Sequence, residues 1–290
     1  MEHLFEYQIN YYSDSKNNTI LPYSLFGLTQ QGQAHQSMSI GNQDAGSIYI
    51  GKKIIIGVVA DGCTSGFNLN GKSSNQVGAQ LGSYLTVRIL RKLILKKHTP
   101  LSKELLLSFE QELLINYKKL LNTLNPWQNE KDFVVKNLFL TTLTFFIVTD
   151  KEYLIANCGD SDIIINGLYK NLTSDGGKYF ASNLKYSQRL ENGKLSLEPN
   201  LRFNQIDQGY TSDLNNIFIS TDGFLDSDII SCSAFQDFFI NDSINENTLG
   251  FIDRKTEFRR EFLGQVQEMK DGRIWPYDDA TFISLRRIFK

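Results

Sequence analysis

The segment SIYIGKKIIIGVVADG, residues 47 to 62, contains two runs of β-branched and aromatic residues joined by a glycine and a lysine. Ser47–Ile50 and Lys53–Ala60 therefore read as two antiparallel strands with a tight turn between them. The second run ends in Asp61 and Gly62. The segment predicts a first strand pair whose far end carries a carboxylate on a flexible turn.

Two long helices are predicted after this pair. From Ser74 to Leu95, apolar residues recur with a helical period. Thr99 and Pro100 are typical of an N-cap and a first helical position, and the following apolar stripe ends at Asn125. The first stripe consists of Val77, Leu81, Leu85, Ile89 and Leu93.

The remaining elements complete a fold dominated by strands. Alternating and apolar runs predict three successive antiparallel strands and two later ones. Residues 171–213 are polar and predict an irregular excursion over the surface. A further helix is predicted at Glu257–Lys270. Strand clusters separated by a helix pair favour antiparallel sheets with helices outside them, and one domain over residues 1–290. The predicted strands are Leu138–Thr149, Tyr153–Cys158, Asp162–Asn166, Ile217–Thr221 and Thr281–Arg286.

Composition limits the functional classes. The net charge of −2 gives no general attraction to nucleic acid or to anionic membranes, and a basic stretch between Arg88 and Lys97 has apolar residues at helical spacing, which is typical of a solvated helix face. Apolar runs are too short to span a bilayer and the start of the chain lacks a signal-like segment, so we expect a cytoplasmic protein. Three cysteines lie far apart and only three histidines occur, so a bound metal would be held mainly by oxygen.

Aspartates fall repeatedly at the ends of the predicted strands. A single Asp-Gly is usually a plain turn. Neighbouring strand ends would nevertheless bring several carboxylates together, and their mutual repulsion favours a bound divalent cation. Two such ions about 4 Å apart can activate a water molecule and hold a phosphate for in-line attack without a covalent intermediate. The aspartates concerned are Asp44, Asp61, Asp160, Asp222 and the pair Asp278-Asp279.

In order along the chain, these motifs resemble the signature blocks of the type 2C metal-dependent protein serine/threonine phosphatases, and Gly32, His35 and the Asn-Gln-Asp run look most like a divergent bacterial branch. The resemblance implies an α+β fold, a four-layer α-β-β-α sandwich of two antiparallel sheets flanked by helices. Residues 171–213 would occupy the place of the family's variable flap. The motifs are Asn42-Gln43-Asp44-Ala45, Val59-Ala60-Asp61-Gly62, Thr141-Thr142-Leu143-Thr144, Ala156-Asn157-Cys158-Gly159-Asp160-Ser161, Ser220-Thr221-Asp222-Gly223 and Asp278-Asp279-Ala280-Thr281.

The same resemblance implies two Mg²⁺ or Mn²⁺ ions, with a third and weaker position. Asp61 would bridge both ions, the Gly62 carbonyl would join the second, and Asp222 and Asp278 would hold the first. Asp44 would orient water from behind the ligands. Asp160, together with Asp222, would hold the third ion.

Two features depart from the common family pattern. Gln43 stands where a glutamate is usual, which removes one negative charge from the second ion, although its neutral oxygen could still bind. No arginine precedes Asp44 at the usual phosphate-clamping place, and His35 lies nearby instead. Two interpretations of His35 stay open: contact with phosphate or proton donation to the leaving oxygen, and a purely structural hydrogen bond.

The resulting prediction is a monomeric enzyme acting on phosphoproteins, with Asp61, Asp222 and His35 as its catalytic residues. A bacterial serine/threonine kinase is the expected opposing partner, and no nucleic acid or membrane is expected. Two alternatives share the fold: a weak or inactive pseudophosphatase that binds phosphoproteins, which Gln43 favours, and a phosphoesterase for small molecules.

Overall fold

The computed structural model describes residues 9–13, 21–37, 41–62, 76–124, 134–135, 138–170, 203–224 and 278–287. Within these residues the chain forms strands β1 (Ile9–Ser13), β2 (Tyr23–Gln30), β3 (Ala45–Ile50), β4 (Ile54–Ala60), β5 (Leu143–Thr149), β6 (Glu152–Cys158), β7 (Asp162–Ile165), β8 (Leu168–Lys170), β9 (Asn204–Tyr210), β10 (Asn216–Ser220) and β11 (Ala280–Arg287). The helices are α1 (Gln33–Ser37), α2 (Gln76–Arg91), the π-helical turn η1 (Lys92–Lys96), α3 (Lys103–Leu124) and the 3₁₀ turns η4 (Thr211–Asp213) and η5 (Asp222–Phe224). None of the described helices is both long and apolar enough to cross a membrane.

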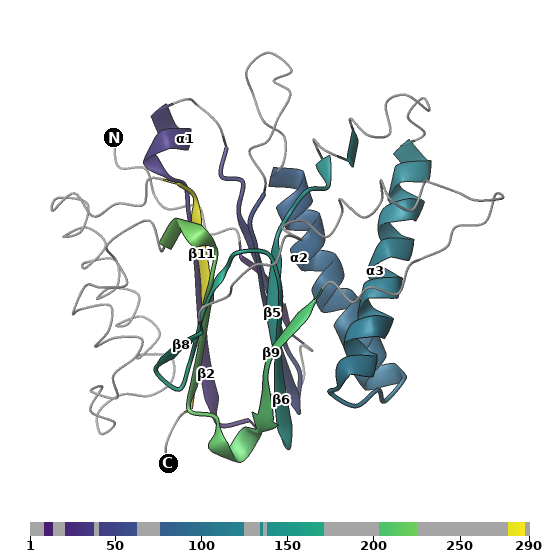
Figure 1. The fold of residues 1–290 in the computed structure, drawn as a ribbon, viewed down its shortest axis with the longest axis vertical. Coiled ribbons are helices and arrows are strands. Elements are labelled where there is room, and N and C mark those ends of the chain that lie inside the picture. Colours follow the sequence, from purple (N-terminus) through teal and green to yellow (C-terminus); the bar gives the residue numbers. More distant parts are fainter. Residues whose placement is uncertain are drawn as a thin grey trace, which may run out of the picture.

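The strands form two sheets that face each other (Figure 1). One has six strands in the order β1-β3-β4-β5-β6-β9, and the other has five in the order β2-β11-β10-β7-β8. Every described pairing is antiparallel except that of β1 with β3, which is parallel. The predicted α+β sandwich is therefore confirmed, with one parallel pair at the edge of the larger sheet.

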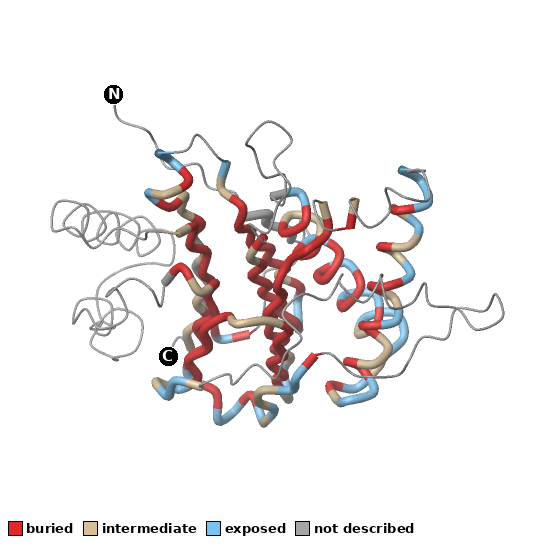
Figure 2. The backbone as a smooth tube through the Cα atoms, turned by 45° about the horizontal axis from the view of Figure 1, so that its top comes forward, coloured by how far each residue is buried: buried red, intermediate tan, exposed pale blue. Residues whose placement is uncertain are grey.

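The central strand β4 is buried on both faces, which explains its unbroken apolar sequence. Ile55 and Val59 point into the cluster between the sheets, where they meet residues of β10 and β11 such as Ile219 and Ile283. Ile56 and Val58, which point to the opposite face, belong to the cluster under the helices. In Figure 2, the buried strands of the two sheets lie side by side. Continuing this alternation by one step turns Asp61 toward the space between the sheets.

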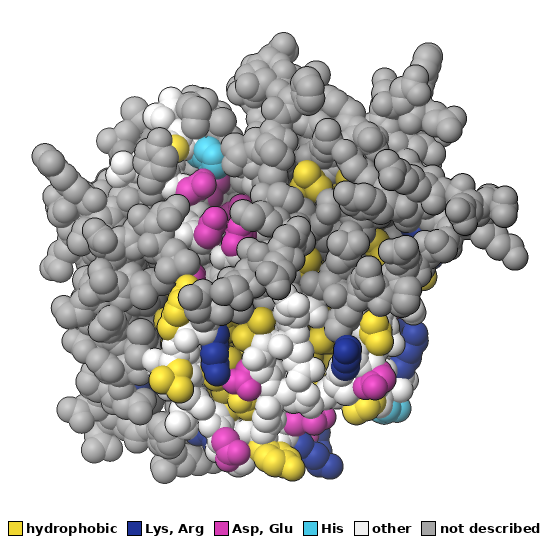
Figure 3. Space-filling model, in the orientation of Figure 1, with side chains coloured by type: hydrophobic (Ala, Val, Ile, Leu, Met, Phe, Trp, Pro, Cys, Tyr) yellow, Lys and Arg dark blue, Asp and Glu magenta, His cyan; other side chains and the backbone are white. Residues whose placement is uncertain are grey.

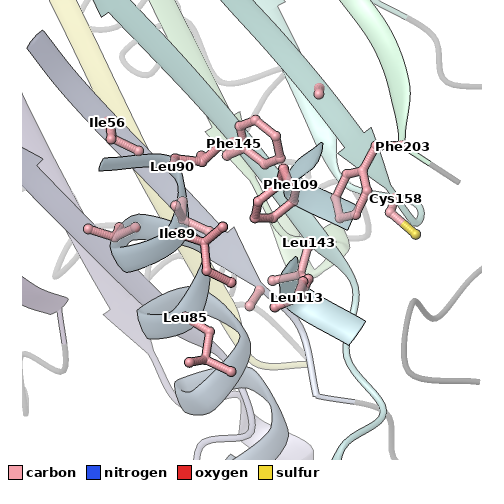
Figure 4. Packing of buried hydrophobic residues seen from close by; sticks show 14 of the residues in the cluster. Ile56, Leu85, Ile89, Leu90, Phe109, Leu113, Leu143, Phe145, Cys158 and Phe203 are labelled. Atoms are coloured by element: carbon pink, nitrogen blue, oxygen red, sulfur yellow. The ribbon is translucent and has the colours of Figure 1, made fainter. Parts of the chain in front are cut away.

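Helices α2 and α3 cover the outer face of the six-stranded sheet (Figures 1 and 4). Leu85 and Ile89 of α2 are buried there, as predicted, whereas Val77 at the start of the stripe is 49% exposed. Phe109 of α3 packs edge-on against Phe145 of β5, with ring centroids 5.1 Å apart. The helices therefore cover one face of this sheet, and its other face packs against the five-stranded sheet.

Several boundaries differ from the predicted ones. The helix expected to start after Thr99 begins at Lys103, and the strand expected from Leu138 begins at Leu143. Strand β9, at 204–210, replaces the last part of the predicted irregular segment. It lies at a sheet edge with partly exposed or exposed side chains, so it lacks an apolar periodicity. The rest of that segment, residues 171–202, and the predicted helix 257–270 lie outside the described residues.

The prediction of three successive antiparallel strands was wrong at its last step. β5 pairs with β6, but β7 belongs to the opposite sheet, where it pairs with β10 and β8. Gly159, with φ of 138°, makes the crossing possible, because this backbone conformation is open to glycine and strained for other residues. Asp160 lies in this connection, between the end of β6 and the start of β7.

Candidate metal centre

The end of β4 is held in place by two threonines. The N–H of Asp61 donates to the Thr142 hydroxyl at 3.1 Å, and the Asp61 carbonyl accepts from the Thr142 N–H at 2.9 Å and from the Thr141 hydroxyl at 2.7 Å. Gly62 continues the pairing by bridging to Thr141. With its main chain fixed in this way, Asp61 presents its side chain at a defined place beyond the strand.

The turn after β10 approaches the turn before β11 very closely. The Thr221 N–H donates to the Thr281 carbonyl at 2.9 Å, and η5 begins at the next residue, Asp222. A Cβ atom on Gly223 would stand 1.9 Å from the Asp279 carbonyl oxygen. Only glycine fits there, so the sequence Asp-Gly serves to bring the Asp222 and Asp278-Asp279 turns together.

Three carboxylates from distant parts of the chain meet at this end of the sheets. Asp61, Asp160 and Asp222 each place a carboxylate oxygen within 4.8 Å of the other two. They arrive from the end of β4, from the crossing between β6 and β7, and from η5. Figure 3 shows acidic side chains gathered in a hollow of this face, beside one histidine.

Burial and the crowding of negative charges raise the pKa of Asp61 to about 7. Burial is the largest cause, followed by the negative charge of Asp222, with smaller contributions from Asp160 and Asp278. The pKa of Asp44 is also raised well above its ordinary value, first by burial and then by the charge of Asp61. A divalent cation would remove this repulsion, so the donor set fits hard cations such as Mg²⁺ or Mn²⁺.

Asp44 lies behind these carboxylates and is fully enclosed. The Thr221 hydroxyl donates to Asp44 Oδ2 at 2.6 Å, and the Asp44 N–H donates to the Asn42 side-chain oxygen at 2.9 Å. Extending the β3–β4 register beyond Ala45 and Ala60 places Asp44 opposite Asp61. The role of Asp44 in orienting metal-bound water stays a prediction.

His35 and Asp278 form a neighbouring group with Asp279. His35, on the short helix α1, is buried, and its Nδ1 lies 2.8 Å from Asp279 Oδ2 and 3.7 Å from Asp278 Oδ1. The pKa of His35 is raised, chiefly by its hydrogen bond with Asp279 and against the opposing effect of burial. Asp278 remains about half exposed at the opening of the site.

Asp279, for which the sequence predicted no role of its own, is the more enclosed member of its pair. The alternation of inward and outward residues along β11 could have identified Asp279. Thr281, Ile283 and Leu285 of β11 face the inter-sheet space, and counting back by two reaches Asp279 rather than Asp278. The side chain that points inward was therefore predictable from β11.

The buried side-chain amide of Gln43 bears on whether a second ion fits the site. Its side chain is 1% exposed, and within the described part of the chain neither its amide oxygen nor its amide nitrogen has a hydrogen-bond partner. The β3–β4 register, extended by two residues, places it opposite Gly62. A buried amide without partners is costly, so a bound ion or its water fits this position.

Comparisons with known proteins bear on the family and the fold of the chain. A sequence model described as Protein phosphatase 2C matches residues 31–248. No curated protein matches the sequence. Two variants of a bacterial serine phosphatase share the fold, each with a TM-score of 0.50: one is 14% identical, covering 94% of this chain and 100% of that chain, and the other is 16% identical, covering 92% and 98%. Staphylococcus aureus serine/threonine phosphatase Stp1 is 17% identical, covering 93% and 96%, with a TM-score of 0.49.

Proposed function

Because the chain belongs to the protein phosphatase 2C family, we propose that it hydrolyses phosphoserine and phosphothreonine esters in proteins with the help of divalent cations. The observation that carries the proposal is the meeting of Asp61, Asp160 and Asp222 within 4.8 Å at the end of the sandwich. Carboxylates this close have little reason to be gathered without a cation to neutralise them.

In the proposed site, Asp61, Asp222 and Asp278 would hold the main ions together with the Gly62 carbonyl, and Asp160 would add a weaker position. Mg²⁺ or Mn²⁺ bound there would supply Lewis-acid activation of water and neutralise charge on the phosphate.

Asp44, held by Thr221, would orient the attacking water. The water oxygen forms a bond to phosphorus as the ester P–O bond breaks, which yields inorganic phosphate and the free hydroxyl. His35 would contact the phosphate or protonate the leaving oxygen.

The proposed substrate is a phosphoprotein, and a bacterial serine/threonine kinase would supply it. The test measures hydrolysis of phosphothreonine peptides and of an aryl phosphate, with and without Mn²⁺. Asp61→Asn and Asp222→Asn should each lower the metal-dependent rate by more than about a hundredfold, since replacement of supporting residues alone costs up to that amount. The matched control is Asp150→Asn, which removes an aspartate paired with Lys53 at the turn between β5 and β6 and should leave the rate unchanged.

The outcomes separate the proposal from its alternatives. Absence of hydrolysis with any metal would favour a phosphoprotein-binding pseudophosphatase, for which the neutral Gln43 is the supporting observation. Hydrolysis of the aryl phosphate alone would favour a small-molecule phosphoesterase. Equal rates in the wild type and in Asp61→Asn would show that the cluster of carboxylates around Asp61 is not needed for hydrolysis.

A further inference from the structure

The Asp279 carboxylate accepts two main-chain hydrogen bonds and lies against the imidazole ring of His35. Oδ1 accepts from the Gly32 N–H at 2.7 Å, and Oδ2 accepts from the Gln43 N–H at 2.5 Å. Oδ2 also lies 2.8 Å from His35 Nδ1. The two main-chain hydrogen bonds hold the carboxylate in one orientation with the imidazole ring beside it, so Asp279 is a fixed point within the site.

This arrangement determines which nitrogen of His35 is free. Because Nδ1 is turned toward Asp279, Nε2 is the ring nitrogen left for a ligand. The ring cannot swing away without leaving a buried carboxylate partly unpartnered. Asp279 thus selects one orientation of the imidazole, as carboxylates do for histidines in many metal sites.

Asp279 is also tied rigidly to the carboxylates that would hold the ions. Its N–H donates to Asp278 Oδ1 at 2.8 Å. Its carbonyl faces Gly223 so closely that no other residue fits there, and Gly223 directly follows Asp222. A displacement of Asp279 would therefore move His35 relative to both aspartates.

From these contacts we propose that Asp279 is a positioning residue that holds His35 with Nε2 directed at the phosphoryl group of the substrate. This inference rests on the proposed function and extends it. Asp279 does not contact the phosphate itself. It acts through His35, which takes over phosphate contact in a site where the sequence places no arginine before Asp44.

The experiment is a double-mutant cycle with Asp279→Asn, His35→Gln and the double variant, with Asp150→Asn as control. Binding of inorganic phosphate to the Mn²⁺-loaded protein is measured by calorimetry, and KM and kcat with a phosphothreonine peptide. Each single variant should weaken phosphate binding about tenfold, the size expected for one charged hydrogen bond. The double variant should be no weaker than the worse single variant, because both changes remove the same contact.

Two further measurements distinguish positioning from general damage. Mn²⁺ affinity of Asp279→Asn should stay within about threefold of the wild type, since Asp279 is not assigned as a ligand. Nitrogen NMR of labelled histidine should show the Nδ1–H form of His35 in the wild type and its loss in Asp279→Asn, with His35→Gln identifying the signal among the three histidines.

The proposal is overturned if the two losses multiply in the double variant, if Mn²⁺ binding collapses in Asp279→Asn, or if wild-type His35 carries no proton on Nδ1. Should Asp279→Asn fail to fold, the nitrogen NMR measurement of His35 in the wild type still tests the proposal. Phosphate binding requires no turnover. An inactive protein with the expected coupling would refute the proposed function while leaving this inference standing.

Discussion

Gln43 is the residue at which the candidate metal centre departs most from a fully charged donor set. Its amide is buried without a hydrogen-bond partner among the described residues, close in register to Gly62. A neutral oxygen can bind a hard cation, but a carboxylate binds it more strongly because ligand charge sets much of the affinity.

The variant Gln43→Glu should therefore bind Mn²⁺ more tightly, by about tenfold or 1.4 kcal/mol. In the absence of metal the same variant should be less stable than the wild type, because it adds a buried carboxylate beside Asp44 and Asp61. Calorimetric titration with Mn²⁺ and thermal melting in EDTA measure the two effects. Gln205→Glu, at an exposed position of β9, is the control. An unchanged Mn²⁺ affinity would place residue 43 outside the ion's reach.

At the scale of elements, the site depends on how the turn after β10 meets the turn before β11. Gly223 is the contact point, with no room for a Cβ beside the Asp279 carbonyl. Asp222 and Asp278, which belong to these two turns, cannot both keep their places if the turns separate. The glycine thus has a geometric role as well as the conformational one that Asp-Gly turns usually have.

Replacing Gly223 by alanine should destabilise the protein by about 1–3 kcal/mol, the usual cost of forcing extra atoms into a packed region. It should also weaken Mn²⁺ binding, because the Asp222 and Asp278 turns are pushed apart. Gly209→Ala on edge strand β9 is the control: the nearest atoms to its Cβ would belong to the Tyr153 side chain, at 3.0 Å, so stability should fall without loss of Mn²⁺ affinity. Retention of wild-type Mn²⁺ affinity by Gly223→Ala would count against the assignment.

The same elements explain which parts of the fold were predictable from sequence. Strands β3 and β4 were recognised because β4 is buried on both faces and its apolar run is unmistakable. β2 was missed, since its alternating inward residues include Gly27 and Thr29 as well as Tyr23. β9 was missed because an edge strand with exposed side chains has no apolar pattern to detect.

The candidate site was predictable in its residues but less so in its internal contacts. Asp61, Asp160 and Asp222 could be selected because strand ends in one sandwich must lie near each other. Which sheet received β7 depended on the crossing at Gly159, a long-range choice that local sequence does not encode. The pairing of His35 with Asp279 likewise joins residues far apart in the chain.

Considered as a whole molecule, the sandwich holds its acidic end together through contacts that cross between the sheets. Thr221, following β10 of the five-stranded sheet, donates to Asp44, which precedes β3 of the six-stranded sheet. The apolar cluster below binds the sheets along the rest of their length. The repulsion among carboxylates therefore acts directly on the packing of one sheet against the other, and the stability of the metal-free protein should depend on pH.

The sign of that dependence follows from the raised pKa values. Asp61 titrates near 3.8 in the unfolded chain and near 7 in the folded protein, so the folded state binds more protons between these values and its unfolding free energy falls as pH rises from about 4 to 7. Asp44 and His35, whose pKa values are also raised, change stability in the same direction. In EDTA, the melting temperature should therefore drop by several degrees between pH 5 and pH 8, and Mn²⁺ should raise it more at pH 8 than at pH 5. Asp61→Asn should flatten both trends, whereas Asp150→Asn should preserve them. A metal-free melting temperature that rises from pH 5 to pH 8 would contradict the carboxylate repulsion on which the metal centre is built.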